Sequence, residues 1–120
     1  RMKEKKQLLD NIISGIQEKK GKNITTIDLK GIPGVICDYF VVCEGNTPTQ
    51  VAAVAQSVEH VVKTNTQESP IRVQGHQLAE WIAIDYGNIM VHIFVPAMRS
   101  FYNIDNLWSD AKIETIPNVE

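Results

Sequence analysis

The side chains that could hold a metal ion or act in catalysis are dispersed along this chain. Three carboxylates that fall on expected strands or beside them, Asp28, Asp38 and Asp85, come one to a segment, and no strand carries an Asp-x-Asp or Asp-x-Glu pair. Nucleotidyl transfer needs paired carboxylates to hold Mg²⁺ against the phosphates. A nucleotidyltransferase-like enzyme is therefore kept only as an alternative hypothesis.

The histidines and the short motifs also fail to form a recognisable reaction centre. His60, His76 and His92 fall on three different expected elements, so a zinc site would need them to meet in space. The chain has no G-x-G-x-x-G, no G-x-x-x-x-G-K-[ST] and no C-x-x-C motif. The sequence predicts no metal, no cofactor and no catalytic residue.

Two cysteines, Cys37 and Cys43, lie six residues apart in an apolar context. If both belong to one extended strand, they are separated by roughly 20 Å, since a strand rises about 3.3 Å per residue. Bridged cysteines have Cα atoms within about 7 Å, so a disulfide is excluded. We expect both to be small core residues of a protein from a reducing compartment.

The segment "EWIAIDYGNIMVHIF" (80–94) predicts a β-hairpin in which both faces carry large side chains. A two-residue turn at Gly87–Asn88 fixes the register, because Gly at the first central position supports a primed turn. Side chains alternate across a sheet, so the register separates two sets of residues. One set is a conventional core face: Ile82, Ile84, Tyr86, Ile89, Val91 and Ile93. The other set carries Trp81, Ala83, Asp85, Met90, His92 and Phe94.

The second hairpin face determines the functional hypothesis. A solvated antiparallel face normally carries Thr, Lys, Glu or Ser, whereas Trp, Phe, Met and His resemble the centre of a protein–protein interface. We therefore predict a partner-binding surface there. The alternative is that the C-terminal helix covers this face.

The remaining elements predict a single α/β domain. Apolar spacing predicts helices over about residues 3–20, about 47–64 and 97–112; Thr47, Pro48 and Gln50 form a helix start with a capping box. Strands are expected in "NITTIDLKG", in the buried "CDYFVVCEG", in "IRVQG" and in the hairpin, with "IETIPNVE" as a docked or frayed tail. The expected fold is a mixed sheet of about five strands with flanking helices, in one domain over 1–120.

Length and charge narrow the class of partner. With 120 residues and ordinary apolar content, the chain can build its own core, and it has no apolar run long enough for a transmembrane helix. Its first residues do not form a secretory signal. The chain has a net charge of −2 and does not show the basic stripe that is typical of a phosphate-binding protein. We expect a protein partner, with little direct nucleic-acid binding.

An ordered set of motifs covers nearly the whole chain. It comprises Asp38 before an aromatic strand, Gly45–Asn46 before a helix, Trp81, Asp85–Tyr86–Gly87, His92, Arg99, Phe101–Tyr102, Leu107–Trp108 and Asp110–Ala111. In this order they resemble the ribosomal silencing factor family, also called Iojap-like proteins. Gln74 and Asn88 depart from the family pattern, each removing a negative charge beside the predicted binding face.

The resemblance implies a non-enzymatic factor with a nucleotidyltransferase-like topology but no active site. Such a factor binds the large ribosomal subunit through its ribosomal protein fourteen, sterically blocks association with the small subunit and represses translation under nutrient limitation. The expected partner-binding residues are Trp81, Asp85, Tyr86, Met90, His92, Phe94, Arg99, Tyr102 and Trp108. We expect a bacterial cytoplasmic protein rather than one of an organelle matrix. A homodimeric interaction module and an assembly factor for the large subunit remain alternatives.

Overall fold

The computed structural model describes residues 2–120. Its helices are α1 (Met2–Glu18), α2 (Pro48–Thr66), α3 (Pro96–Tyr102) and the short 3₁₀ helix η1 (Ile104–Asn106). Its strands are β1 (Lys22–Asp28), β2 (Tyr39–Glu44), β3 (Arg72–Gln74), β4 (Trp81–Asp85), β5 (Ile89–Phe94) and β6 (Lys112–Ile116). The predicted mixed α/β fold is confirmed, with six strands in place of about five.

The start of α2 forms as its residue types predict. The Thr47 hydroxyl accepts a hydrogen bond from the backbone N–H of Gln50 at 3.1 Å, and Pro48 is the first helical residue. The Gln50 side chain in turn accepts from the backbone N–H of Asn46 at 2.7 Å. These bonds satisfy N–H groups that have no partner within the helix, which fixes where α2 begins.

The six strands form one sheet in the order β3-β4-β5-β2-β1-β6. The central strands β2 and β5 run parallel, and the other neighbours are antiparallel. The predicted hairpin register is confirmed, with Trp81 opposite Phe94, Ala83 opposite His92 and Asp85 opposite Met90. Its turn contains Gly87 at φ +88°, a conformation that favours glycine.

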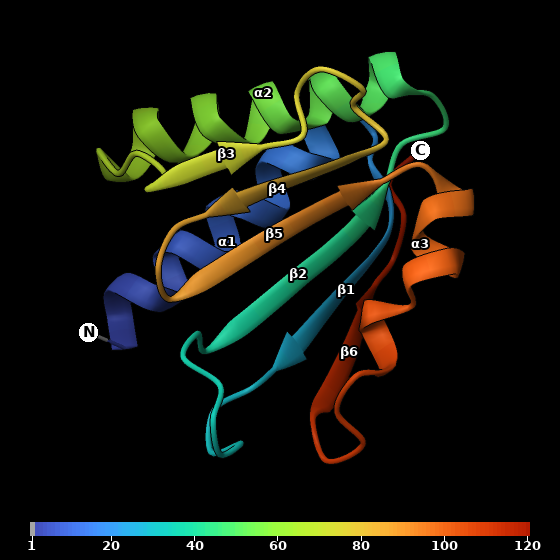
Figure 1. Ribbon diagram of the computed structural model, residues 1–120. Coiled ribbons are helices and arrows are strands. Elements are labelled where there is room, and N and C mark those ends of the chain that lie inside the picture. Colours follow the sequence, from blue (N-terminus) through green and yellow to red (C-terminus); the bar gives the residue numbers. More distant parts are fainter. Residues whose placement is uncertain (1) are drawn as a thin grey trace.

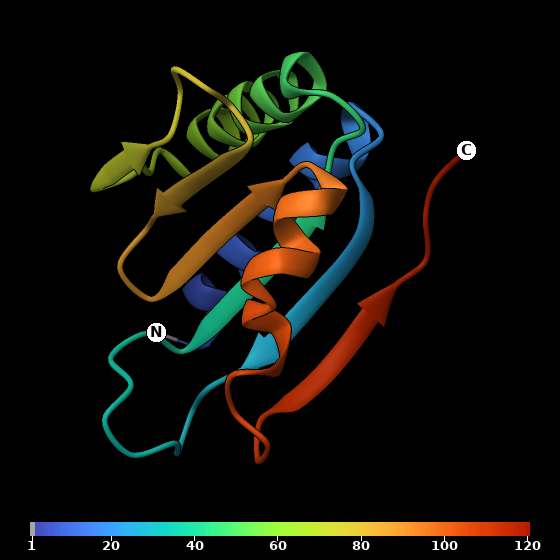
Figure 2. The same cartoon turned by 45° about the vertical axis from the view of Figure 1, so that its right-hand side comes forward.

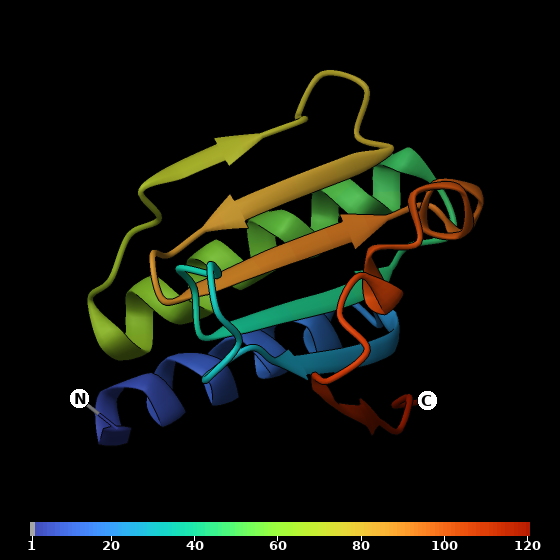
Figure 3. The same ribbon diagram turned by 60° about the horizontal axis from the view of Figure 1, so that its bottom comes forward.

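The sheet separates two apolar clusters of unequal size. Helices α1 and α2 lie side by side on one face, whereas α3 and the connection over residues 29–38 lie on the other (Figures 1, 2 and 3). The main core cluster lies under α1 and α2 and includes Ile12, Ile16, Val54, Val58, Ile82, Ile84, Val91 and Ile93. The second core cluster lies on the opposite face and consists of Ile27, Leu29, Val42, Phe94 and Ile104.

The C-terminal quarter differs from the prediction. The helix expected over 97–112 ends at Tyr102, because Asn103 adopts a left-handed conformation (φ 51°) that terminates the helix. The segment expected to be a tail forms β6, which pairs with β1 along its whole length at the edge of the sheet. Cys43 is buried in β2 as expected, but Cys37 precedes that strand and is only half-buried.

Close contact between α1 and α2 depends on Gly15. A Cβ at this position would lie 2.7 Å from the Cα of Val58, and the Ser57 hydroxyl donates to the Gly15 carbonyl at 2.7 Å. We predict that Gly15→Ala lowers the free energy of unfolding by about 2 kcal/mol, because the helices must separate. This loss outweighs the gain of about 1 kcal/mol in helix propensity that alanine brings.

Urea denaturation followed by circular dichroism measures the effect of Gly15→Ala. Ser14→Ala is the matched control, since Ser14 is exposed on the same turn of α1 and its replacement should change stability by no more than about 0.5 kcal/mol. A Gly15→Ala protein as stable as the wild type would contradict the contact.

Candidate functional site

The second hairpin face is partly covered by the C-terminal segment. Phe94 is fully buried and His92 is 5% exposed. Met98 of α3, Ile104 of η1 and Trp108 all belong to the second core cluster or pack against it. The alternative of cover by the C-terminal segment therefore holds for Phe94 and His92, which offer little contact surface, and partner binding by the rest of this face stays a prediction.

Tyr86 is also unavailable, because it lies on the opposite side of the sheet. It belongs to the main core cluster and is 6% exposed. Its hydroxyl has no hydrogen-bond partner among the described residues, and burial raises its pKa above the ordinary value, with the nearby carboxylates of Glu59 and Glu68 acting in the same direction. Tyr86 is a core residue rather than a contact residue.

Asp85 and Met90 lie opposite each other at the turn end of the hairpin, and both are half-buried. The Asp85 carboxylate accepts a hydrogen bond from the backbone N–H of Gly87 at 2.8 Å. This bond closes the turn, so Asp85 has a structural role that needs no partner. Partner binding by the exposed portions of Asp85 and Met90 stays a prediction.

Trp81 is held in a fixed orientation by its neighbours. Its indole N–H donates to Nδ1 of His92 at 3.1 Å. Its ring stacks on Phe94 at a centroid distance of 4.9 Å and contacts Tyr102 at 4.7 Å. Because the bond and the stacking select one rotamer, little side-chain entropy remains to be lost when the half-exposed ring meets a partner.

An open groove lies beside Trp81. It has a volume of about 600 Å³ and is bounded by the connection between β3 and β4 on one side and by α3 on the other; its lining includes Gly75, Leu78, Glu80, Trp81, Met98 and Tyr102. Leu78 is 76% exposed and Tyr102 is 47% exposed. Exposed apolar side chains around a rigid aromatic ring are typical of a protein-binding site. We call these six residues the Trp81 groove.

Leu78 and Met98 are groove residues that the sequence prediction missed. Leu78 lies in the short connection Gly75–Glu80, where it and Ala79 are the two apolar side chains and give no periodic signal. Gly75 allows this stretch to fold against β4, because a Cβ there would overlap the Trp81 carbonyl oxygen at 2.0 Å. An exposed leucine three residues after a glycine that cannot be replaced is a local sign that this connection lines the groove.

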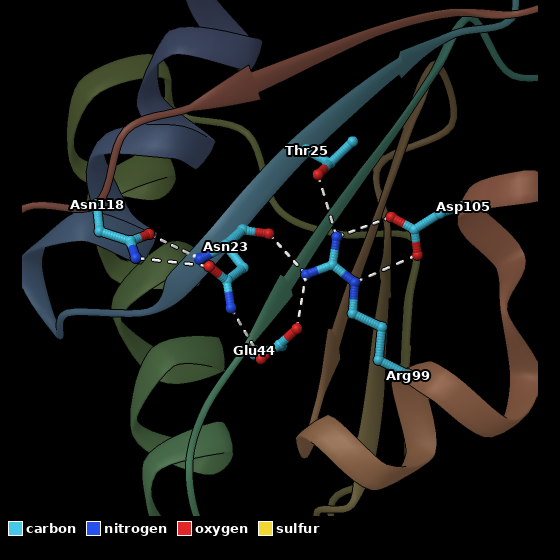
Figure 4. A network of polar contacts seen from close by, with 6 residues as sticks. All are labelled: Asn23, Thr25, Glu44, Arg99, Asp105 and Asn118. Carbon is cyan, nitrogen blue, oxygen red and sulfur yellow. Dashed lines mark hydrogen bonds and ion pairs between the residues drawn. The ribbon is translucent and has the colours of Figure 1, made fainter.

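Arg99 and Trp108 occupy internal positions. The Arg99 guanidinium donates to the Asn23 carbonyl, Thr25, Glu44 and Asp105, and its side chain is 13% exposed (Figure 4). Trp108 is half-buried and packs edge-on against Phe40 at 5.3 Å. The prediction that Arg99 presents its charge to a partner is not supported by this geometry, because all its donors are directed inward.

Two of the carboxylates considered for catalysis form ion pairs with lysines. Asp28 pairs with Lys30 at 3.5 Å, and Asp38 pairs with Lys5 at 2.6 Å. Within residues 2–120, no three His, Cys, Asp or Glu side chains come together in a way that could hold a metal ion. No helix in that range is long and apolar enough to cross a membrane.

Burial of the His92 imidazole makes stability depend on pH. Burial lowers the pKa of His92 from 6.5 to about 4, while Asp105 opposes this shift weakly. The folded state therefore holds neutral His92, whereas the unfolded chain takes up a proton below pH 6.5. The resulting stabilisation is complete above pH 6.5 and is lost as the pH falls toward 4, amounting to about 3 kcal/mol.

We predict that a His92→Gln variant loses less stability than the wild type between pH 7.5 and pH 4.5. Urea denaturation at both pH values gives the comparison, with His60→Gln as the control, because His60 is exposed on α2. Equal pH dependence of the wild type and His92→Gln would show that His92 is not held neutral.

Comparison with known proteins connects this geometry to a family. The family model described as "Ribosomal silencing factor during starvation" matches residues 2–120. Proteins named ribosomal silencing factor RsfS are 36% identical in Halalkalibacterium halodurans, covering 88% of each chain, and 33% identical in Bacillus subtilis, covering 90% of each. A crystal structure from Chromobacterium violaceum is similar at a TM-score of 0.81, with 29% identity over 89% of this chain and 88% of that chain. The chain belongs to the ribosomal silencing factor family.

Proposed function

We propose that this protein binds the large ribosomal subunit through its ribosomal protein fourteen and prevents the small subunit from joining. Occupying a surface that the small subunit needs is a steric mechanism, so no turnover and no cofactor are required. Translation is lowered as a result under nutrient limitation. We propose further that the protein acts in the bacterial cytoplasm and is not an enzyme.

The Trp81 groove is the observation that carries this proposal. It offers Leu78, Tyr102 and the half-exposed ring of Trp81, with Phe101 76% exposed beside it. Aromatic and aliphatic anchors around a preformed pocket are the residues that dominate binding energy in protein interfaces. The groove requires little rearrangement, because Trp81 is already fixed by His92 and Phe94.

The charge of the chain supports a protein partner over nucleic acid. The net charge is −2, and Glu80 lines the groove beside its apolar residues. A carboxylate at the rim favours a partner surface with positive charge and steers the encounter more than it adds affinity. We therefore expect the groove to bind a basic, partly apolar protein surface rather than RNA.

Assembly of the large subunit is a second candidate function. A mouse relative named "Mitochondrial assembly of ribosomal large subunit protein 1" is 22% identical over 84% of this chain and 45% of its own length. An assembly factor would bind precursor particles and be absent from mature subunits. Co-sedimentation with mature large subunits as efficient as with precursors would favour the silencing function.

We predict that Leu78→Glu weakens binding to purified large subunits by about 2 kcal/mol, or roughly thirtyfold in Kd. The reason is that a charge replaces an apolar anchor at the rim of the groove, while the exposed position leaves the fold unaffected. Co-sedimentation at increasing protein concentration gives the Kd. A subunit-joining assay with the small subunit should show the same loss of inhibition.

Ile71→Glu is the matched control for Leu78→Glu. Ile71 is 68% exposed and does not line the groove; it lies beside Gly87 at the turn end of the hairpin. This variant should bind large subunits as the wild type does. Unchanged binding by Leu78→Glu, or equal weakening by both variants, would remove the groove from the interface.

A homodimer is the remaining alternative use of the groove. A second copy of the chain would bury the same apolar residues, and dimerisation would then compete with binding to the subunit. Sedimentation velocity at micromolar concentration distinguishes the two. If the groove serves the ribosome alone, we expect a monomer in the wild type and in Leu78→Glu; a wild-type dimer that Leu78→Glu dissociates would support self-association.

A further inference from the structure

Helix α3 supplies one wall of the Trp81 groove but has little means of holding itself in place. It spans seven residues, and none of the residues Pro96–Tyr102 is buried. Its N-cap, Val95, makes no side-chain capping bond. A helix of this length is unstable on its own, because the cost of nucleation exceeds the gain from so few hydrogen bonds. Contacts from other elements must therefore determine where Met98 and Tyr102 lie.

Arg99 makes those contacts from the middle of α3. Its guanidinium donates to the Asn23 carbonyl at 2.6 Å and to the Thr25 hydroxyl at 3.1 Å, both on β1. It also donates to Glu44 of β2 at 3.0 Å, and twice to Asp105 of η1 at 2.7 and 3.2 Å. One side chain thus joins α3 to two strands and to the segment that follows the helix (Figure 4).

The groups that accept hydrogen bonds from Arg99 are themselves held in place. Asn23 has a left-handed backbone (φ 54°) at the place where the β1–β2 register shifts, which leaves its carbonyl available to Arg99. The Asn23 side chain donates to Glu44 at 3.1 Å, and its backbone N–H donates to Asn118 at 2.8 Å. The side chains of Glu44 and Asp105 are 17% and 19% exposed, so neither carboxylate moves freely in solvent.

The hydrogen bonds of the Arg99 guanidinium have a geometry that can orient α3. A planar guanidinium meets a carboxylate through two parallel bonds, which defines both distance and angle, whereas an ammonium acts as a point charge. A partly buried ion cluster adds little net stability, because desolvation offsets most of the attraction. The specific placement of α3 therefore explains an arginine at this position better than a gain in stability does.

We propose that Arg99 is a positioning residue for the Trp81 groove, acting through α3 on Met98 and Tyr102 without touching the partner. The inference rests on the proposed function, since it concerns binding in that groove. Tyr102 stands three residues after Arg99 and contacts Trp81 at 4.7 Å. A shift of α3 therefore separates the two aromatic rings that form adjacent walls of the groove.

The variants Arg99→Lys and Asp105→Asn test the proposal. Arg72→Lys is the matched control, because Arg72 is exposed on β3. Arg99→Lys keeps the positive charge but loses the planar fork. Asp105→Asn leaves Arg99 in place but removes one of its charged acceptors. The first measurement is amide hydrogen exchange of the free proteins over residues 96–106, with α1 and α2 as internal references. Its rate shows how firmly α3 is held in place. Co-sedimentation with purified large subunits reports binding.

We expect both variants to speed exchange over 96–106 while α1 and α2 stay protected, and to weaken binding about fivefold. In a Tyr102→Ala background, Arg99→Lys should weaken binding by less than the fivefold expected with Tyr102 present, because one of the two groups that it positions is already absent. Arg72→Lys should change neither measurement.

Three results would overturn the proposal. Exchange over 96–106 that is unchanged in Arg99→Lys would show that Arg99 does not fix α3. Unchanged binding despite faster exchange would show that α3 placement does not matter for the groove. An undiminished effect of Arg99→Lys in the Tyr102→Ala background would indicate direct contact. Failure of the wild-type chain to bind large subunits would instead overturn the proposed function, while the exchange result still decides whether Arg99 fixes α3.

Discussion

The parallel pairing of β2 with β5 at the centre of the sheet is the constraint on which the rest of the structure depends. Val41, Val42 and Cys43 in β2 are fully buried, as are Ile93 and Phe94 in β5, so apolar side chains point to both faces. Both faces consequently need cover. Helices α1 and α2 cover one face, whereas only α3, η1 and the 29–38 connection remain for the other. The Trp81 groove lies where this second covering ends.

Local chemistry explains why much of the fold could be predicted from the sequence. The hairpin register follows from a two-residue turn, and the start of α2 follows from Thr47, Pro48 and Gln50, all within a few residues of one another. Family membership could likewise be predicted, because the ordered motifs run along nearly the whole chain. Alternation placed Trp81, His92 and Phe94 on one face correctly.

The extent of burial on that face could not be predicted, because it depends on contacts far apart in the sequence. Arg99 meets Asn23 and Thr25, more than seventy residues away, and no periodic pattern records such a pairing. β6 was missed for a related reason, since its partner β1 lies at the other end of the chain. Leu78 was overlooked because a short connection gives no periodic signal. Alternation placed Tyr86 on the core face correctly, and only its inclusion among the partner-binding residues disagrees with its burial.

The sequence contains two tryptophans, Trp81 and Trp108, and both pack against the second core cluster. The layer formed by α1 and α2 contains none. The intrinsic fluorescence of this protein is therefore a local signal from the face that carries α3. Trp81 borders the groove and bonds to an imidazole, while Trp108 rests on Phe40. Emission from the unlabelled chain thus distinguishes loosening of the α3 side from unfolding of the helical layer, which circular dichroism follows separately.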